Sequence, residues 1–154
     1  VDGEPYFGEL FDGRGRCGII GAATLTVFNH NGNYQFIVGQ RSAQMATGAG
    51  MYHVLPAFVM QPVKRDPAWI TSEWQVEHQV MREFGEELFA MPEFDAWSPP
   101  PDDPTYFYDY PPVADLREML TDGRAKIYAT GIAMMLRSLR PEICTAIKPP
   151  SPPP

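Results

Sequence analysis

The segment Arg82-Glu83-Phe84-Gly85-Glu86-Glu87 constrains the fold more than any other part of the chain. At 3.6 residues per turn, its three glutamates emerge on one side of a helix over about one turn. Apolar side chains recur every four residues along the same helix and predict its buried stripe. These are Val76, Val80, Phe84 and Leu88. The sequence thus predicts a helix that packs on a core and carries three carboxylates at the edge of that contact.

Three carboxylates this close together need a neutralising partner. Like charges four residues apart destabilise an isolated helix by about 0.2–0.5 kcal/mol, and more when partly desolvated. Arg82 can neutralise one of them, and a hard cation can take the rest. Oxygen ligands with no Cys or His beside them in the sequence favour Mg²⁺ or Mn²⁺ over zinc. The alternative is a solvated, glutamate-rich helix face that binds nothing.

This pattern resembles the second half of the Nudix box, the signature of hydrolases that act on nucleoside diphosphates linked to another group. In full, the box reads G-x5-E-x7-R-E-U-x-E-E-x-G-U. Upstream, residues 40–42 read Gln-Arg-Ser and residues 53–56 read His-Val-Leu-Pro, where the family has a Gln-Arg pair and a Leu-Pro-Gly-Gly turn. The resemblance covers at least residues 18–89.

The chain departs from the box at its glycines and its first acid. Residues 57–58 read Ala-Phe in place of Gly-Gly. The opening Gly, the first Glu and the closing Gly fall at Ala68, Trp74 and Phe89. Because glycine lets the backbone turn tightly, these replacements change the loop geometry without removing the metal ligands. Glu73, one residue before the expected acid, is a candidate substitute.

The resemblance implies an α/β fold, a Nudix-like α/β/α sandwich around a mixed β-sheet. It also implies that Glu83, Glu86 and Glu87 bind Mg²⁺ (or Mn²⁺), with Glu83 as general base and Arg82 orienting the carboxylates. The implied function is Mg²⁺-dependent hydrolysis of a nucleoside-diphosphate-linked substrate, by a pyrophosphohydrolase that cleaves phosphoanhydride bonds.

Three further residues are candidates for substrate binding. Arg41 follows the second predicted strand and can donate two hydrogen bonds to a phosphate; an ion pair within the sheet is the alternative. His53 lies beside a predicted strand on the family's substrate side, and Glu142 enters a late strand, where the family sometimes places an auxiliary base. Structural roles remain open for both.

Two other classes of function remain. The first is a catalytically silent Nudix-fold domain that binds a nucleotide-like small molecule as the sensor of a larger regulatory protein. The second is a scaffold for protein–protein contact. Because the chain starts with Val1 and not with Met, it is interpreted as trimmed or as a piece of a longer protein. A fused or partner regulatory domain and a homodimer are both compatible with the sequence.

Composition narrows the class of protein. The 154 residues are 44% apolar, enough for a single domain at residues 1–147, followed by a proline-rich tail or linker stub at residues 148–154. A net charge of −7 without a basic run argues against nucleic-acid polymers as partners. No apolar stretch is long enough to span a bilayer, which predicts a soluble, cytoplasmic protein. Cys17 and Cys144 predict neither a disulfide framework nor a zinc site.

The expected elements follow from residue patterns. An arm or edge strand is expected at residues 1–16, followed by strands at 19–29 and 34–38 joined by a tight Asn31-Gly32 turn. A surface loop covers residues 43–52. The box helix is expected at residues 73–89, because Ser72 and Gln75 form a capping box. After it come a long connection at 91–112 with a short strand at 106–108, a helix at 113–121, and strands at 126–136 and 142–147.

Gly85 is unusual inside a predicted helix. Glycine there costs about 1 kcal/mol relative to alanine. We therefore expect another part of the chain to pack closely against the helix at this position.

Overall fold

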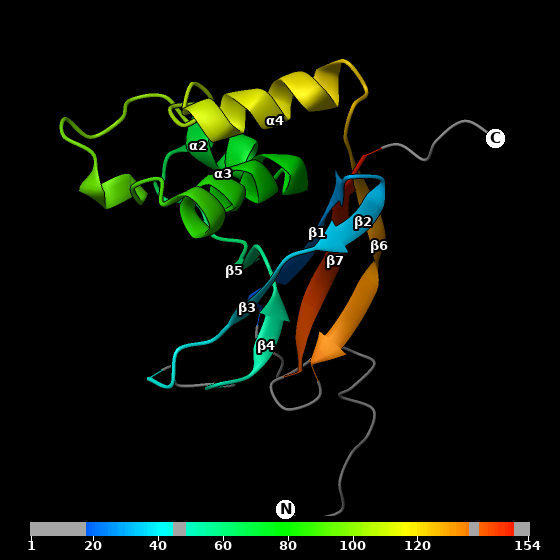
Figure 1. The fold of residues 1–154 in the computed structure, drawn as a ribbon. Coiled ribbons are helices and arrows are strands. Elements are labelled where there is room, and N and C mark those ends of the chain that lie inside the picture. The colour runs from blue at the N-terminus through cyan, green and yellow to red at the C-terminus, as the bar shows by residue number, and fades with distance from the viewer. Residues whose placement is uncertain (1–17, 45–48, 136–138, 150–154) are drawn as a thin grey trace, which may run out of the picture.

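The fold is mixed α/β, and the computed structural model describes residues 18–44, 49–135 and 139–149 (Figure 1). These ranges contain a five-stranded mixed sheet, a two-stranded sheet and three α-helices. The strands are β1 (Gly21–His30), β2 (Asn33–Phe36), β3 (Val38–Gln40), β4 (Tyr52–Val54), β5 (Ala57–Val59), β6 (Lys126–Met135) and β7 (Arg140–Lys148). The helices are α2 (Pro67–Glu73), α3 (Val76–Phe89) and α4 (Pro111–Thr121), with a 3₁₀ turn η1 (Phe94–Ala96) between α3 and α4.

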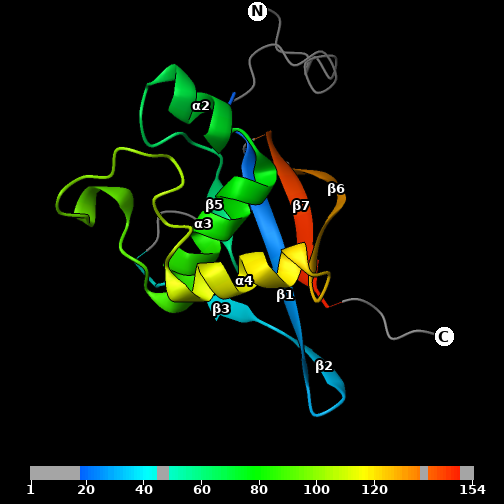
Figure 2. The same cartoon turned by 90° about the horizontal axis from the view of Figure 1, so that it is seen from above.

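Strand β1 organises the larger sheet. Along one edge it pairs antiparallel with β5 near its start and with β2 near its end. Along the other edge it pairs in parallel with β7, which in turn pairs antiparallel with β6. Figures 1 and 2 show α2, α3 and α4 gathered as one helical group beside this sheet. The α/β class and the mixed sheet expected from the sequence are confirmed.

The first hairpin forms where the sequence predicts it. Asn31 (φ 52°) and Gly32 (φ 81°) make a two-residue turn, and positive φ at both positions is what such a turn requires. The expected strand at 34–38 is divided, however. Ile37 donates its N–H to Thr26 O at 3.0 Å, after which β3 leaves β1 and pairs with β4. The chain thereby forms a second, two-stranded sheet.

The predicted start of the box helix at residue 73 is wrong. Asp66 accepts a hydrogen bond from the Ala68 N–H at 2.9 Å and so caps the additional helix α2, which has Pro67 in its first turn. Ser72 lies inside α2 and donates to Ala68 O at 3.3 Å, so it caps nothing. Helix α3 then begins at Val76, and its N-cap Gln75 makes no capping hydrogen bond through its side chain.

The close approach expected at Gly85 is confirmed. A Cβ added there would lie 2.9 Å from Val113 Cγ2 and 3.0 Å from Met91 Sδ. Glycine thus allows α3 and α4 to pack at a distance that any side chain would prevent. The last turn of α3 ends at Ala90, whose φ of 54° is left-handed.

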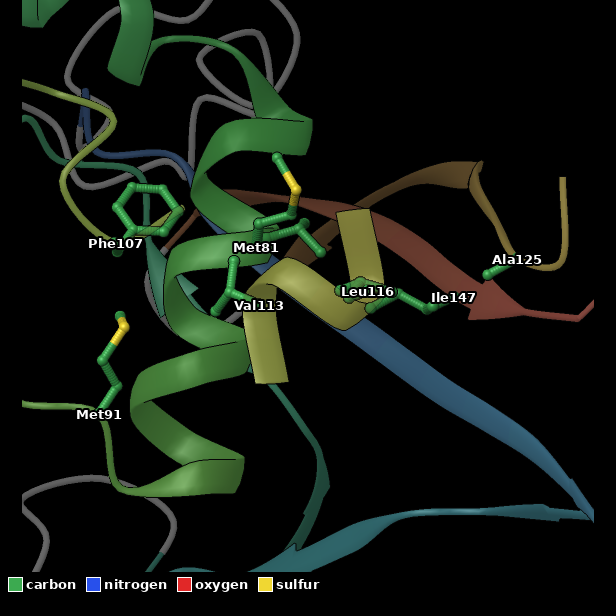
Figure 3. Packing of buried hydrophobic residues seen from close by; sticks show 8 residues of the cluster. Met81, Met91, Phe107, Val113, Leu116, Ala125 and Ile147 are labelled. Atoms are coloured by element: carbon green, nitrogen blue, oxygen red, sulfur yellow. The ribbon is translucent and has the colours of Figure 1, made fainter. Parts of the chain in front are cut away.

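The hydrophobic core lies between α3, α4 and the larger sheet (Figure 3). Val80, Val113 and Phe107 are fully buried at its centre. The strand expected at residues 106–108 is wrong, because these residues form a turn that inserts Phe107 among the helices. Their aromatic residues favour a strand in isolation, but here the rings pack edge to face: Tyr106 and Tyr108 both lie about 5 Å from the Phe107 ring.

The last two expected strands are confirmed as β6 and β7, with β6 at an edge of the sheet. Lys148 belongs to β7 and not to the tail.

The arm at residues 1–16 and the tail residues 150–154 lie outside the described residues, as do Cys17 and residue 136. Cys144 is a free thiol. None of the helices in the described ranges is both long and apolar enough to cross a membrane.

Candidate functional site

An acidic pocket of about 430 Å³ opens beside α3. One wall is the helix, a second is the segment that follows β5, and a third is the approach to η1. The charged side chains on these walls are Arg82, Glu83, Glu86, Glu93 and Asp95. Four carboxylates against one guanidinium leave the pocket with an excess of negative charge.

Arg82 is the centre of this pocket's electrostatics. It is 6% exposed, and its guanidinium lies 2.8 Å from Glu83 Oε1 and 3.2 Å from Glu86 Oε2. It also donates to Gln79 Oε1 at 2.9 Å. Burial by itself would lower the pKa of Arg82, but Glu83 and Glu86 outweigh that effect and raise the pKa. The sequence-based expectation that Arg82 pairs with the helix carboxylates is confirmed.

Glu83 is the most perturbed carboxylate of the pocket. Burial raises its pKa to about 7, and the neighbouring carboxylates of Glu86 and Glu93 add to the rise, whereas Arg82 opposes it. Its side chain is 13% exposed on an open pocket wall. A carboxyl group with a pKa near neutrality can both accept and release a proton at physiological pH.

Glu86 and Glu87 point to different surroundings. Burial raises the pKa of Glu86, and its ion pair with Arg82 opposes the rise. Glu87 instead accepts a hydrogen bond of 3.0 Å from the backbone N–H of Ala57, the first residue of β5. In the parts of the chain that the structure describes, no three His, Cys, Asp or Glu side chains are grouped closely enough to hold a metal ion.

Two carboxylates of the pocket remain candidates for holding Mg²⁺ together with a substrate. Mg²⁺ is usually bound through one or two carboxylates, with waters and substrate phosphates completing the octahedron. Glu83 and Glu86 both line the pocket, so they supply two carboxylates on one wall. Both carboxylates are also paired with Arg82, so a cation sharing them would need water and phosphate oxygens as its other ligands.

Of the predicted substrate contacts, Arg41 lies near both His53 and Glu87. Arg41 follows β3, and His53 is on β4 opposite Gly39. Burial lowers the pKa of His53, and the charge of Arg41 lowers it further. Burial raises the pKa of Glu87, and the Ala57 N–H and the charge of Arg41 oppose the rise. Arg41 Nε and His53 Nδ1 are buried atoms without a hydrogen-bond partner in the described chain. The fold thus brings Arg41, His53 and Glu87 into one electrostatic neighbourhood.

Glu142 lies elsewhere. It is on β7 between Gly21 of β1 and Ala133 of β6, and it forms an ion pair with Arg140. Its carboxylate covers Gly21, where a Cβ would collide with it. Glu142 is not among the residues that line the acidic pocket.

Two buried polar groups lie close to the pocket without lining it: Glu73, the predicted substitute for the first acid of the box, and Gln79, which sequence reasoning missed. Glu73 is 1% exposed and accepts the Val63 N–H at 2.7 Å, which fixes the segment that forms a pocket wall. Burial raises the pKa of Glu73, and this N–H and Arg82 oppose the rise. Gln79 is fully buried against Arg82. Gln79 has no sequence signal for this role, because a polar residue on a helix rich in charged side chains is expected to face solvent.

Glu93 and Asp95 were also missed, because the segment after α3 reads as a featureless connection. Their position on the pocket wall depends on η1 and on the chain reversal at Ala90, neither of which has a strong sequence signal.

Comparison with known proteins gives no match: no family model, no curated protein and no solved structure is significantly similar to the chain.

Proposed function

We propose that the acidic pocket hydrolyses a phosphoanhydride bond in a nucleoside-diphosphate-linked substrate that binds with Mg²⁺ or Mn²⁺. The observation that carries the proposal is Glu83, a carboxyl group with a pKa of about 7. It lies on the wall of an open pocket that holds four carboxylates and one guanidinium. The arrangement of Arg82 between Glu83 and Glu86 supports a relationship to the Nudix hydrolases, with an α/β/α sandwich as the complete fold.

A bound Mg²⁺ would neutralise phosphate charge and acidify a water molecule, and Glu83 and Glu86 would hold it. Glu83 accepts the proton of the attacking water while the water oxygen bonds to phosphorus. The bridging P–O bond breaks, and the leaving phosphate carries away its electron pair. Arg82 keeps both carboxylates aimed at the pocket, and Gln79 fixes Arg82. Glu87 holds β5 against α3 through Ala57 and so shapes the pocket.

The test is phosphate release from nucleoside triphosphates, ADP-ribose, dinucleoside polyphosphates and sugar nucleotides, each with Mg²⁺ or Mn²⁺. We expect Glu83→Gln to lower kcat by about 10²–10⁴-fold, the usual contribution of a positioned general base. Glu77→Gln is the matched control, because Glu77 is exposed in the first turn of the same helix. Turnover that survives Glu83→Gln would exclude Glu83 as the base.

A second candidate is a nucleotide-binding sensor domain without turnover. The observation in its favour is that the three box carboxylates already have N–H partners: Glu83 and Glu86 bind Arg82, and Glu87 binds Ala57. Binding of the same compounds by calorimetry, with no phosphate released by a folded protein, would support this candidate over hydrolysis.

A further inference from the structure

Strand β6 has one edge without a partner strand in the described parts of the chain. It is the last strand of the larger sheet and pairs only with β7, and Figure 2 shows it as the outermost strand beyond β7. The open edge of a strand presents a row of unpaired backbone N–H and C=O groups, to which another extended strand can add. The backbone of β6 therefore specifies the kind of partner that fits it, which is a β-strand.

The length of this edge distinguishes β6 from the smaller strands of the fold. Strands β2, β3, β4 and β5 have only three or four residues each, and short edge strands offer few groups for pairing. Strand β6 has ten residues, which extend over about 30 Å. It contains no proline, and its only charged residue, Lys126, is at its start. The usual features that keep an edge strand from pairing are therefore nearly absent from β6.

A β-bulge at Thr130 interrupts the pairing of β6 with β7 but leaves a regular edge after it. The register shifts between Ala129 and Gly131, and the Thr130 hydroxyl donates to Cys144 O at 3.0 Å, which holds the extra residue against β7. From Gly131 to Met135 each residue pairs with β7 without a further shift. These five residues carry no charge, so they form a regular, neutral edge.

The side chains along this edge are apolar and exposed. Ile132 is 79% exposed, and Tyr128, Met134 and Met135 are between 36% and 45% exposed. Because side chains alternate along a strand, Met134 and Met135 lie on opposite faces of the sheet. A strand added to this edge places its own side chains beside those of β6 on both faces, so an apolar strand fits it best.

Charge and symmetry favour a second copy of this chain as the source of that strand. Two molecules with a net charge of −7 repel each other, so a contact between them must avoid carboxylates, and β6 contains no Asp or Glu. A twofold axis makes two copies of one strand run antiparallel. The two Lys126 side chains then lie at opposite ends of the contact, whereas a parallel arrangement would place them side by side.

We propose that β6 of one molecule pairs antiparallel with β6 of a second copy, which joins the two larger sheets into one. The pairing satisfies the open backbone edge and covers Ile132, and β6 supplies apolar side chains to both sides of the contact. No residue of β6 lines the acidic pocket, so the dimer is independent of any hydrolysis there.

Sedimentation equilibrium under reducing conditions, which prevent disulfide-linked dimers, tests the proposal. We expect a reversible monomer–dimer equilibrium. Ile132→Lys places two positive charges in the contact and should raise the Kd of the dimer by about tenfold or more, whereas Ile132→Val should leave the Kd within about threefold. Tyr52→Lys is the matched control, because Tyr52 is 71% exposed on the short strand β4 and its replacement should leave the Kd unchanged. A protein that stays monomeric at about 0.5 mM, or a dimer whose Kd Ile132→Lys does not change, would overturn the proposal.

Hydrogen exchange of the wild-type protein gives a second test that needs no variant. The amides of β6 should exchange more slowly as the protein concentration rises, because pairing with a second copy engages their N–H groups. The amides of β3 and β4 should exchange at a rate independent of concentration. Protection that rises with concentration in β3 and β4 but not in β6 would place the interface elsewhere and overturn the proposal.

Discussion

The carboxylate of Glu87 accepts a hydrogen bond of 3.0 Å from the backbone N–H of Ala57, which joins the last turns of α3 to the start of β5. The same residue was expected to turn toward a metal with Glu83 and Glu86. The helix spacing places the three side chains on one side of α3, but their hydrogen-bond partners differ. Two are held by Arg82 and the third by a strand.

Replacing Glu87 tests this connection. Glu87→Ala leaves the Ala57 N–H without its partner, so we expect a loss of about 1–2 kcal/mol in the free energy of unfolding. Glu87→Gln keeps an acceptor oxygen and should lose less than half of that. Urea denaturation of the two variants measures the difference. Equal losses would mean that the charge, and not the hydrogen bond, holds β5.

The pH dependence of stability reports on Glu83. Its pKa in the folded protein is about 7, above the ordinary value of 4.5, so its contribution to stability is complete below pH 4.5 and is lost as pH rises through 7. Glu83→Gln removes this titration. We expect the variant to be more stable than the wild-type protein at pH 8 by about 2 kcal/mol, and nearly equal to it at pH 5.

Thermal or chemical denaturation between pH 5 and 8 provides the measurement, with Glu77→Gln as the control for a general loss of charge on α3. A difference that is constant across this range would show that Glu83 does not titrate there.

Arg82 is expected to stabilise the fold more than any other charged side chain near the pocket. Arg82→Met leaves Glu83 and Glu86 as buried carboxylates without a counter-charge, which costs about 3–5 kcal/mol in comparable buried pairs. The loss should be larger at pH 8 than at pH 5, because protonation of the two acids relieves it. Arg124→Gln removes an arginine whose side chain is 55% exposed, and its effect should be that of an ordinary surface substitution. Comparable losses from both variants would contradict this ranking.

Gly85 should not tolerate even a methyl group. A Cβ there approaches Val113 Cγ2 to 2.9 Å, and the strain of separating α3 from α4 should outweigh the gain in helix propensity. We expect Gly85→Ala to lower the free energy of unfolding by about 1–3 kcal/mol. Gly131→Ala, where nothing lies within 4 Å of the added carbon, should change it by less than about 0.5 kcal/mol. A stabilised Gly85→Ala protein would mean that the two helices are looser than the structure shows.

The sequence predicts those parts of the fold whose causes are local. Asn31 and Gly32 make their turn because both residues readily adopt positive φ. Gly85 indicates a close contact because glycine lowers the stability of a helix and is kept there only if a side chain does not fit. Helix α2 also has a local signal, Asp66 before Pro67, although the expected elements include no helix there.

The remaining features depend on contacts between distant segments. Residues 106–108 have strand-forming side chains, but they form a turn that buries Phe107 in the core beside His78 of α3. The separation of Glu87 from Glu83 depends on where β5 presents its first N–H. Neither the residue pattern nor the helix spacing contains that information.

Helix α3 presents two chemically different faces. Glu83 and Glu86 line the acidic pocket, while Phe84 and Phe89 line a separate, largely apolar pocket that α4 also lines. Because Gly85 has no Cβ to collide with Val113, both faces belong to one closely packed pair of helices.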